Sequence, residues 1–248
     1  MNPVLLITGG SRGIGAATAL LAAQRGYDVA VNFTRDEAAA EAVVAGVRSA
    51  GRRAFAVRAD VGVEAEVVAM FNAVDRELGP LRGLVNNAGI VDVAQRVDQM
   101  SAERLTRMMQ INIVGSIVCA REALRRMSTR HGGSGGAIVN LSSAAAKLGA
   151  PGQYVDYAAS KGAIDTFTLG LAREVAAEGV RVNAVRPGII ETEIHASGGE
   201  PDRAARLGPQ APMQRAGTAA EVAAAIVWLL SDEASYCTGT VVDVTGGR

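Results

Sequence analysis

The sequence predicts an α/β protein with a doubly wound parallel sheet of about seven strands and helices on both faces. Short apolar runs alternate with longer helical patterns along almost the whole chain of 248 residues. Several of these runs are nearly continuously apolar, which is typical of strands covered by helices on both sides. No linker, repeat or change of composition interrupts the pattern, so we expect residues 1–248 to form a single domain.

The alternation places each element in turn. The strands are expected at Val4–Thr8, Asp28–Asn32, Ala54–Arg58, Gly83–Val85, Ala137–Leu141, Arg181–Val185 and Thr240–Val244. The helices are expected at Ile14–Arg25, Ala38–Ala50, Glu64–Leu78, Ala102–Met127, Tyr157–Glu178 and Ala219–Leu230. Parallel strands joined this way require right-handed crossovers. The segment Glu193–Met213 lacks clear periodicity, and we interpret it as a loop in which Gly198–Gly199 would hinge a lid over a bound substrate.

Composition excludes several classes of protein. The 25 basic residues balance the 25 acidic ones, which argues against a nucleic-acid or membrane partner recruited by bulk charge. No apolar run reaches the length of a membrane span and no signal peptide precedes the first strand, so we expect a soluble cytoplasmic protein. Cys119 and Cys237 have neither disulfide nor metal spacing, and we expect buried free thiols and no metal site.

A glycine-rich turn joins the first strand to the first helix. It reads Thr8-Gly9-Gly10-Ser11-Arg12-Gly13-Ile14-Gly15. Glycines allow a tight turn and a close approach of backbone to a pyrophosphate, which the start of the helix then stabilises. The turn therefore indicates dinucleotide binding, the alternative being an ordinary glycine-rich loop.

The end of the second strand bears on the choice of cofactor. An acidic residue there would bond the ribose 2′-hydroxyl of NAD, but the chain has Phe33 and Thr34 at this place. Arg12 and Arg35 are suited to a 2′-phosphate, so NADP(H) is favoured and NAD(H) is possible. The alternative is that both arginines are solvated surface residues. Asp36 and Glu37 follow directly and would weaken the positive potential.

Tyr157 and Lys161 are four residues apart in a helical pattern and therefore share one face. A cation one turn away favours the tyrosinate, so we expect Lys161 to lower the pKa of Tyr157 and allow proton transfer near neutral pH. Ser142 and Ser143 end an apolar strand, where parallel sheets place their ligands. Asn112 lies inside a helical pattern and, taken alone, is better interpreted as structural.

Taken together, these motifs resemble the short-chain dehydrogenase/reductase family. The glycine-rich turn, Asn86-Asn87-Ala88-Gly89, Asn112, the serine pair, Tyr157-x-x-x-Lys161 and Pro187-Gly188 with Thr192 occur in that family's order. The resemblance covers Val4 to Gly247 and implies a Rossmann fold and an NAD(P)(H)-dependent oxidoreductase acting on a carbonyl or alcohol carbon. The wider sequence resembles bacterial members of glucose dehydrogenase-like or 3-oxoacyl-acyl-carrier-protein reductase-like type.

The resemblance implies a catalytic set of Asn112, Ser143, Tyr157 and Lys161. Tyr157 would be the general acid/base, Lys161 would hold the nicotinamide ribose, and Asn112 would support a water that relays protons. Ser143 would donate a hydrogen bond to the substrate oxygen. Ser142 stays the alternative, because the spacing from Ser143 to Tyr157 is one residue longer than in many members. Tyr154 lacks a lysine four residues on, and His195 would either touch substrate or lie exposed on the lid.

Cofactor contacts and assembly follow from the same resemblance. The implied cofactor residues are Gly9, Ser11, Arg12, Ile14, Thr34, Arg35, Asp60, Val61, Asn87, Ala88, Gly89, Tyr157, Lys161, Pro187, Gly188, Ile190 and Thr192. Relatives are commonly homotetramers paired through the helices represented by Ala102–Met127 and Tyr157–Glu178. Two other classes stay open: a cofactor-binding sensor without activity, and a redox-neutral epimerase or dehydratase, although such enzymes usually have a longer C-terminal part and a different glycine spacing.

Overall fold

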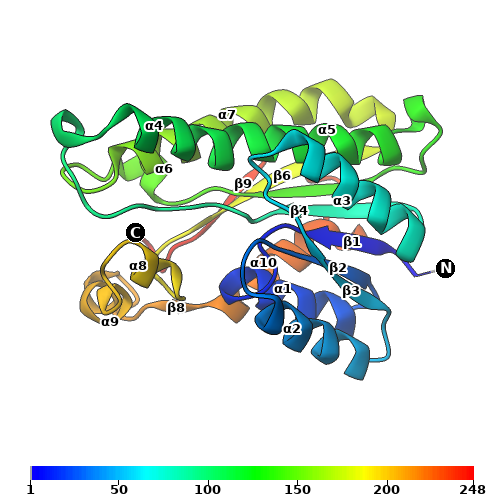
Figure 1. Cartoon of the computed structure of the whole chain (residues 1–248), viewed down its shortest axis with the longest axis horizontal. Helices are drawn as coiled ribbons and strands as arrows, with labels where there is room; N and C mark the ends of the chain where they lie inside the picture. The colour runs from blue at the N-terminus through cyan, green and yellow to red at the C-terminus, as the bar shows by residue number, and fades with distance from the viewer. Residues whose placement is uncertain (1) are drawn as a thin grey trace.

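One sheet of seven parallel strands forms the centre of the protein (Figure 1). The structure is a computed structural model. It describes residues 2–248 except for the side chain of His195. The strands are β1 (Val4–Ile7), β2 (Asp28–Phe33), β3 (Ala54–Arg58), β4 (Leu81–Asn86), β5 (Gly136–Leu141), β6 (Val180–Pro187) and β9 (Val241–Val244). Their order in the sheet is β3-β2-β1-β4-β5-β6-β9. The chain therefore reverses its direction of travel between β1 and β4, and a doubly wound sheet binds its ligands at such a point.

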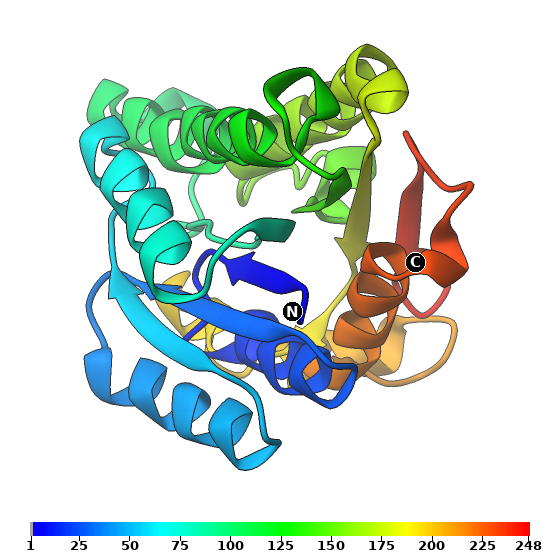
Figure 2. The same ribbon diagram turned by 90° about the vertical axis from the view of Figure 1, so that its right-hand side faces the viewer.

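Helices cover both faces of this sheet, as the sequence predicts. The helices are α1 (Gly13–Gln24), α2 (Glu37–Ser49), α3 (Glu64–Glu77), α4 (Ala102–Met109), α5 (Ser116–Met127), α6 (Ala145–Leu148), α7 (Val155–Val175), α8 (Ile194–Ser197), α9 (Arg203–Leu207) and α10 (Ala219–Leu230). One layer contains α1, α2 and α10, and the other contains α3, α4, α5 and α7 (Figure 2). In the described part of the chain, no helix combines the length and apolar character needed to cross a membrane.

The alternation of side chains along β1 explains why both layers pack tightly. Leu5 and Ile7 join a cluster with the first layer, where Ile226 of α10 is fully buried. Leu6 points the other way and packs with Phe71 of α3 in the second cluster. Because helices cover both faces, β1 is apolar at every position rather than at alternate ones.

The long helix predicted over Ala102–Met127 is interrupted. α4 and α5 are joined by a π-helical segment, Gln110–Gly115. A Cβ atom on Gly115 would lie 2.7 Å from the carbonyl oxygen of Val61, so the segment passes very close to the loop after β3. Such single π turns are often found at functional sites, and this one carries Asn112.

The interpretation of Glu193–Met213 as an irregular loop was wrong. It contains α8, α9 and a 3-10 turn at Gly208–Gln210, and it is framed by a small two-stranded sheet of β7 (Ile190–Glu191) and β8 (Gly217–Thr218). Helices of four or five residues are too short to show a hydrophobic period. Other boundaries move by a few residues: β4 begins at Leu81, and α7 begins at Val155 and ends at Val175. Cys119 and Cys237 are free thiols, the first buried and the second half-buried.

Candidate active site

The glycine-rich turn packs against the ends of two strands. Gly9 has a φ of +60°, which favours glycine, and its N–H donates to the side chain of Asn32 at 3.1 Å. The N–H of Gly10 donates to the carbonyl oxygen of Asn32 at 2.8 Å. A Cβ on Gly15 would lie 2.5 Å from the carbonyl oxygen of Gly9, so only glycine lets α1 begin this close to the turn.

Asn32 was named in the sequence analysis only as the end of a strand, yet it organises this turn. Its fully buried amide donates to the carbonyl oxygens of Val57 at 3.3 Å and Ala59 at 2.9 Å. One side chain thus connects β2, the end of β3 and the glycine-rich turn. The available signal was a polar residue inside an otherwise apolar strand.

The start of α1 is suited to an anion. Arg12 precedes the first turn of the helix without capping it through its side chain, and the first turn has no acidic residue. The first backbone N–H groups of a helix lack partners within the helix, and they carry the positive end of its dipole. These features fit the pyrophosphate of a dinucleotide. Arg12, Thr34 and Arg35 are exposed, while Ser11 is half-buried.

Asn87 and Ala88 lock the end of β4 onto the same turn. The Asn87 amide donates to the carbonyl oxygens of Thr8 and Gly9 at 2.9 and 2.8 Å, and the N–H of Ala88 donates to the Thr8 hydroxyl at 3.0 Å. Asp60 and Val61 lie in the loop after β3. Asp60 accepts a hydrogen bond from the N–H of Gly62 and lines a second cavity with Gln110.

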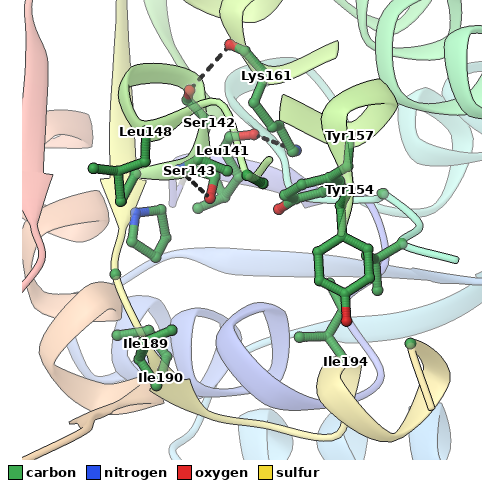
Figure 3. A pocket seen from close by; sticks show the side chains of 18 of the residues that line it. Leu141, Ser142, Ser143, Leu148, Tyr154, Tyr157, Lys161, Ile189, Ile190 and Ile194 are labelled. Atoms are coloured by element: carbon green, nitrogen blue, oxygen red, sulfur yellow. Dashed lines mark hydrogen bonds between the residues drawn. The ribbon is translucent and has the colours of Figure 1, made fainter. Parts of the chain in front are cut away.

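Three of the four predicted catalytic residues, Ser143, Tyr157 and Lys161, meet at the carboxyl end of β5 (Figure 3). The Lys161 ammonium is buried and donates to the carbonyl oxygen of Leu141 at 2.6 Å. Ser142 is also buried, and its hydroxyl donates to the carbonyl oxygen of Lys161 at 3.2 Å. The hydroxyl of Ser143 instead accepts from the N–H of Ala145 at 3.1 Å, and it acts to lower the pKa of Tyr157. Of the two serines, Ser143 is therefore the one paired with the tyrosine.

Burial has the largest effect on the pKa values of Tyr157 and Lys161. Desolvation raises the pKa of Tyr157, and the hydrogen bond with Ser143 acts in the opposite direction. Burial lowers the pKa of Lys161 to about 8, although the carboxylate of Asp165 acts to raise it. The Lys161 ammonium lies 5.6 Å from the centre of the Tyr157 ring. The net direction for Tyr157 is opposite to the lowering expected from helix spacing, because spacing carries no information about burial.

Asn112 is buried, and its side chain bonds protein groups. Its amide oxygen accepts from the N–H of Ile90 at 2.8 Å, while its amide nitrogen donates to the carbonyl oxygen of Ile90 at 3.0 Å and to the Ser160 hydroxyl at 3.1 Å. These bonds hold the loop after β4 next to α7. The proton-relay role implied by the resemblance stays a prediction.

A cavity of about 490 Å³ lies next to Ser143 and Tyr157. The predicted residues that line it are Ile14, Asn87, Gly89, Ser143, Tyr157, Lys161, Pro187, Gly188, Ile190 and Thr192. A Cβ on Gly13 would lie 3.3 Å from Cγ2 of Thr192, so the start of α1 borders the same space. The remaining predicted residues lie outside this cavity: Gly9, Ser11, Arg12, Thr34, Arg35, Asp60, Val61, Ala88 and Asn112.

Among the other lining residues are three polar ones that lie in segments expected to govern substrate choice, Lys147–Tyr154 and Glu193–Met213, but that were not predicted individually. They are Gln153 and Tyr154, just before and at the start of α7, and Arg203 on α9. The Tyr154 hydroxyl donates to Glu200 at 2.8 Å across 46 positions of sequence, a contact that no local pattern signals. The side chain of His195 lies outside the described part of the chain, so its predicted role is not addressed.

Comparison with known proteins decides the family. A model described as enoyl-(acyl carrier protein) reductase matches residues 9–248. An uncharacterized oxidoreductase, YgfF, of Escherichia coli (strain K12) is 58% identical over 245 residues, which cover 99% of both chains. The chain belongs to the short-chain dehydrogenase/reductase family.

Other members of the family support an oxidoreductase with this fold. The 3-oxoacyl-[acyl-carrier-protein] reductase FabG of Staphylococcus aureus (strain Mu50) is 37% identical and covers 100% of this chain and 98% of its own. A short-chain dehydrogenase of Burkholderia cenocepacia J2315, solved in complex with NADP, has a TM-score of 0.91 at 34% identity. That alignment covers 99% of this chain and 97% of the other. This short-chain dehydrogenase/reductase is accordingly an oxidoreductase with a Rossmann-like sheet.

Proposed function

We propose that this enzyme transfers a hydride between a nicotinamide cofactor and a carbonyl or secondary alcohol carbon, with Tyr157 as general acid/base. The observation that carries the proposal is the convergence of Ser143, Tyr157 and Lys161 on one cavity that also reaches the start of α1. A bound nicotinamide would supply or accept the hydride. The protein would bind the substrate oxygen, hold it in place and exchange its proton.

The polar groups divide this work between them. The raised pKa keeps the Tyr157 hydroxyl protonated at neutral pH, as a general acid in carbonyl reduction requires. Ser143 would donate a second hydrogen bond to the same oxygen and stabilise the charge that develops there. Lys161, anchored on the backbone of Leu141, would hold the ribose of the cofactor and keep a positive charge near the reacting oxygen. Most of the rate enhancement would come from this positioning.

NADP(H) is the favoured cofactor and NAD(H) is the alternative. Support comes from Arg12, in the turn before α1, and Arg35, just after β2, which are both exposed and suited to a 2′-phosphate, and from the NADP bound in the Burkholderia relative. Phe33 and Thr34 stand where an acidic residue would select NAD. The turn beginning at Gly9 would hold the pyrophosphate, and Asp60 would flank the adenine.

The family resemblance also supports proposals about assembly and partners. We expect a homotetramer that works in the cytoplasm on small-molecule substrates, without a nucleic-acid or membrane partner. Val114 and Ile117, in the π segment and α5, and Leu169 on α7 are exposed apolar side chains on the two elements expected to pair.

Oxidation of NADPH and NADH, followed by absorbance with a panel of ketones, aldehydes, sugars and β-ketoacyl thioesters, tests the reaction. We expect NADPH turnover to fall at least about a hundredfold in Tyr157→Phe. Binding of NADPH, measured by its fluorescence, should remain close to that of the wild type. Undiminished turnover in the variant would contradict the role of Tyr157. Binding without turnover on any substrate would favour a sensor, and conversion without net NADPH oxidation would favour an epimerase or dehydratase.

A further inference from the structure

The wall of the cavity contains one well-buried guanidinium, that of Arg203. Its side chain is 12% exposed and comes from α9. The guanidinium lies 5.1 Å from the centre of the Tyr154 ring, and it donates to Oε1 of Glu200 at 3.0 Å and to Oε1 of Gln153 at 2.8 Å. A buried arginine in a cavity would ordinarily indicate an anionic ligand. Here the protein itself supplies the anion.

Several hydrogen bonds hold the Glu200 carboxylate next to Arg203. Its Oε1 accepts from Arg203 and from the Tyr154 hydroxyl, and its Oε2 accepts from Arg206. Burial alone would raise the pKa of this carboxyl, but the Tyr154 hydroxyl and the two arginines outweigh it and lower the pKa. Glu200 therefore stays ionised at neutral pH and neutralises the guanidinium that faces the cavity.

The side chains that line the cavity around Arg203 are mostly apolar and offer little to a charged substrate. Leu148, Ile189 and Ile194 border the space next to Ser143 and Tyr157 (Figure 3), and Val91 and Pro151 also line it. Arg248 lines the cavity too, but it is exposed, so water screens its charge. A carboxylate at the far end of a substrate would lose its hydration and find the Arg203 guanidinium already paired with Glu200. Lys161 also lines the cavity, but it donates to the carbonyl oxygen of Leu141 and is the residue proposed to hold the cofactor ribose.

We propose that Glu200 determines specificity by occupying Arg203, so that the cavity accepts neutral, apolar ketones and secondary alcohols and rejects those that carry a carboxylate. This inference rests on the proposed function, since it names the substrate class of the same site. Selectivity would come from apolar contact on the wall and from the unfavourable desolvation of a competing anion.

A matched pair of probes tests the selectivity of the wild-type enzyme. Methyl para-acetylbenzoate and para-acetylbenzoate have the same ketone, and they differ in whether the far end carries an ester or a carboxylate. Binding of each to the NADPH complex is measured by the change in NADPH fluorescence, and turnover by absorbance. We expect the ester to bind at least about tenfold more tightly. Equal binding, tighter binding of the carboxylate, or no binding of either would overturn the inference. Binding of the ester without oxidation of NADPH would instead count against the proposed reaction.

Glu200→Gln keeps the shape of the side chain and releases the charge of Arg203. The ratio of carboxylate to ester binding should rise at least about tenfold, because a charge-assisted bond to Arg203 becomes available. In the double variant Glu200→Gln with Arg203→Met, the ratio should return toward the wild-type value. An unchanged ratio in Glu200→Gln, with NADPH affinity and thermal stability retained, would overturn the role of Glu200.

Tyr154→Phe provides the matched control. It removes the hydroxyl that donates to Glu200 and changes no charge, so it reports any loosening of α8 and α9 without freeing Arg203. The ratio of carboxylate to ester binding in Tyr154→Phe should stay at the wild-type value. The same is expected of Glu174→Gln, which removes an exposed carboxylate from α7. If this ratio changes as much in Tyr154→Phe as in Glu200→Gln, the cause is loosening of α8 and α9. If it changes only in a further variant, Arg248→Ala, the cause is the exposed arginine that lines the cavity. Either result would overturn the inference.

Discussion

Lys161 is buried, and this placement costs the folded protein stability. Burial lowers its pKa from the ordinary value of 10.5 to about 8. Below about pH 8 the folded state holds a desolvated ammonium. Between about pH 8 and 10.5 the unfolded chain still binds the proton while the folded chain releases it. The contribution of Lys161 to the free energy of unfolding therefore rises with pH across this window.

The variant Lys161→Met should reveal this dependence. The stability of the variant relative to the wild type should fall by about 3 kcal/mol between pH 7 and pH 10, because only the wild type gains as its lysine deprotonates. Urea unfolding at several pH values gives the difference. Lys147→Met removes an exposed lysine and controls for the general loss of a positive charge. A difference that does not change with pH would show that Lys161 is not destabilised by burial.

An ion pair between elements holds the start of α7. Arg104 on α4 donates to both carboxylate oxygens of Asp156 at 2.8 and 3.3 Å, and the two side chains are 7% and 0% exposed. Arg104 also donates to the carbonyl oxygen of Val93 at 2.7 Å. Because Asp156 directly precedes Tyr157, the pair connects the loop after β4 to the residue proposed to move the proton.

Asp156→Asn should destabilise the protein by about 3–5 kcal/mol, because it leaves the Arg104 charge buried without its partner. We also expect kcat to fall more than NADPH affinity, since Tyr157 loses a neighbour that positions it. Urea unfolding and steady-state kinetics measure the two effects. Glu77→Gln breaks an exposed pair with Arg76 and should change stability by less than about 1 kcal/mol. Equal effects of the two substitutions would argue against the importance of the buried pair.

The turn between β1 and α1 gives another prediction. Gly15→Ala places a Cβ 2.5 Å from the carbonyl oxygen of Gly9, so the turn must shift and NADPH affinity should fall at least about tenfold. Gly170→Ala is the matched control, because a Cβ there has no neighbour within 4 Å among the described residues. Fluorescence titration with NADPH compares the two. Retained affinity in Gly15→Ala would mean that the turn is not in the binding site.

At the scale of the whole molecule, the sequence predicted the layers well and the path of the segment Glu193–Met213 poorly. The sheet was predictable because the strands are mostly apolar and are separated by segments with a helical period. The π segment around Asn112 was not, since it depends on the close passage of Gly115 by Val61. The bond between Tyr154 and Glu200 joins distant parts of the chain, so local sequence carries no trace of it. The single-domain organisation and the roles of the site residues stay predictions.

Assembly supplies a prediction at the same scale. If α5 and α7 pair between copies, Ile117→Glu combined with Leu169→Glu should split the proposed tetramer toward one or two chains of 25.5 kDa. Light scattering after gel filtration measures the mass. Val63→Glu alters an apolar side chain that is 44% exposed outside these helices, and it should leave the mass unchanged. A wild-type enzyme that is itself monomeric would refute the proposed tetramer.

The packing of α10 on α1 has a consequence for synthesis on the ribosome. Ala22 and Ala23 of α1 share a buried cluster with Ile226 and Leu229, which are translated about 200 residues later. At about 5–20 residues per second, the nascent chain waits roughly 10–40 s before that partner emerges. The waiting surface of α1 is made largely of alanine, whose small side chains offer little area for misdirected contacts. The bulky residues of this contact arrive last, on the helix that closes it.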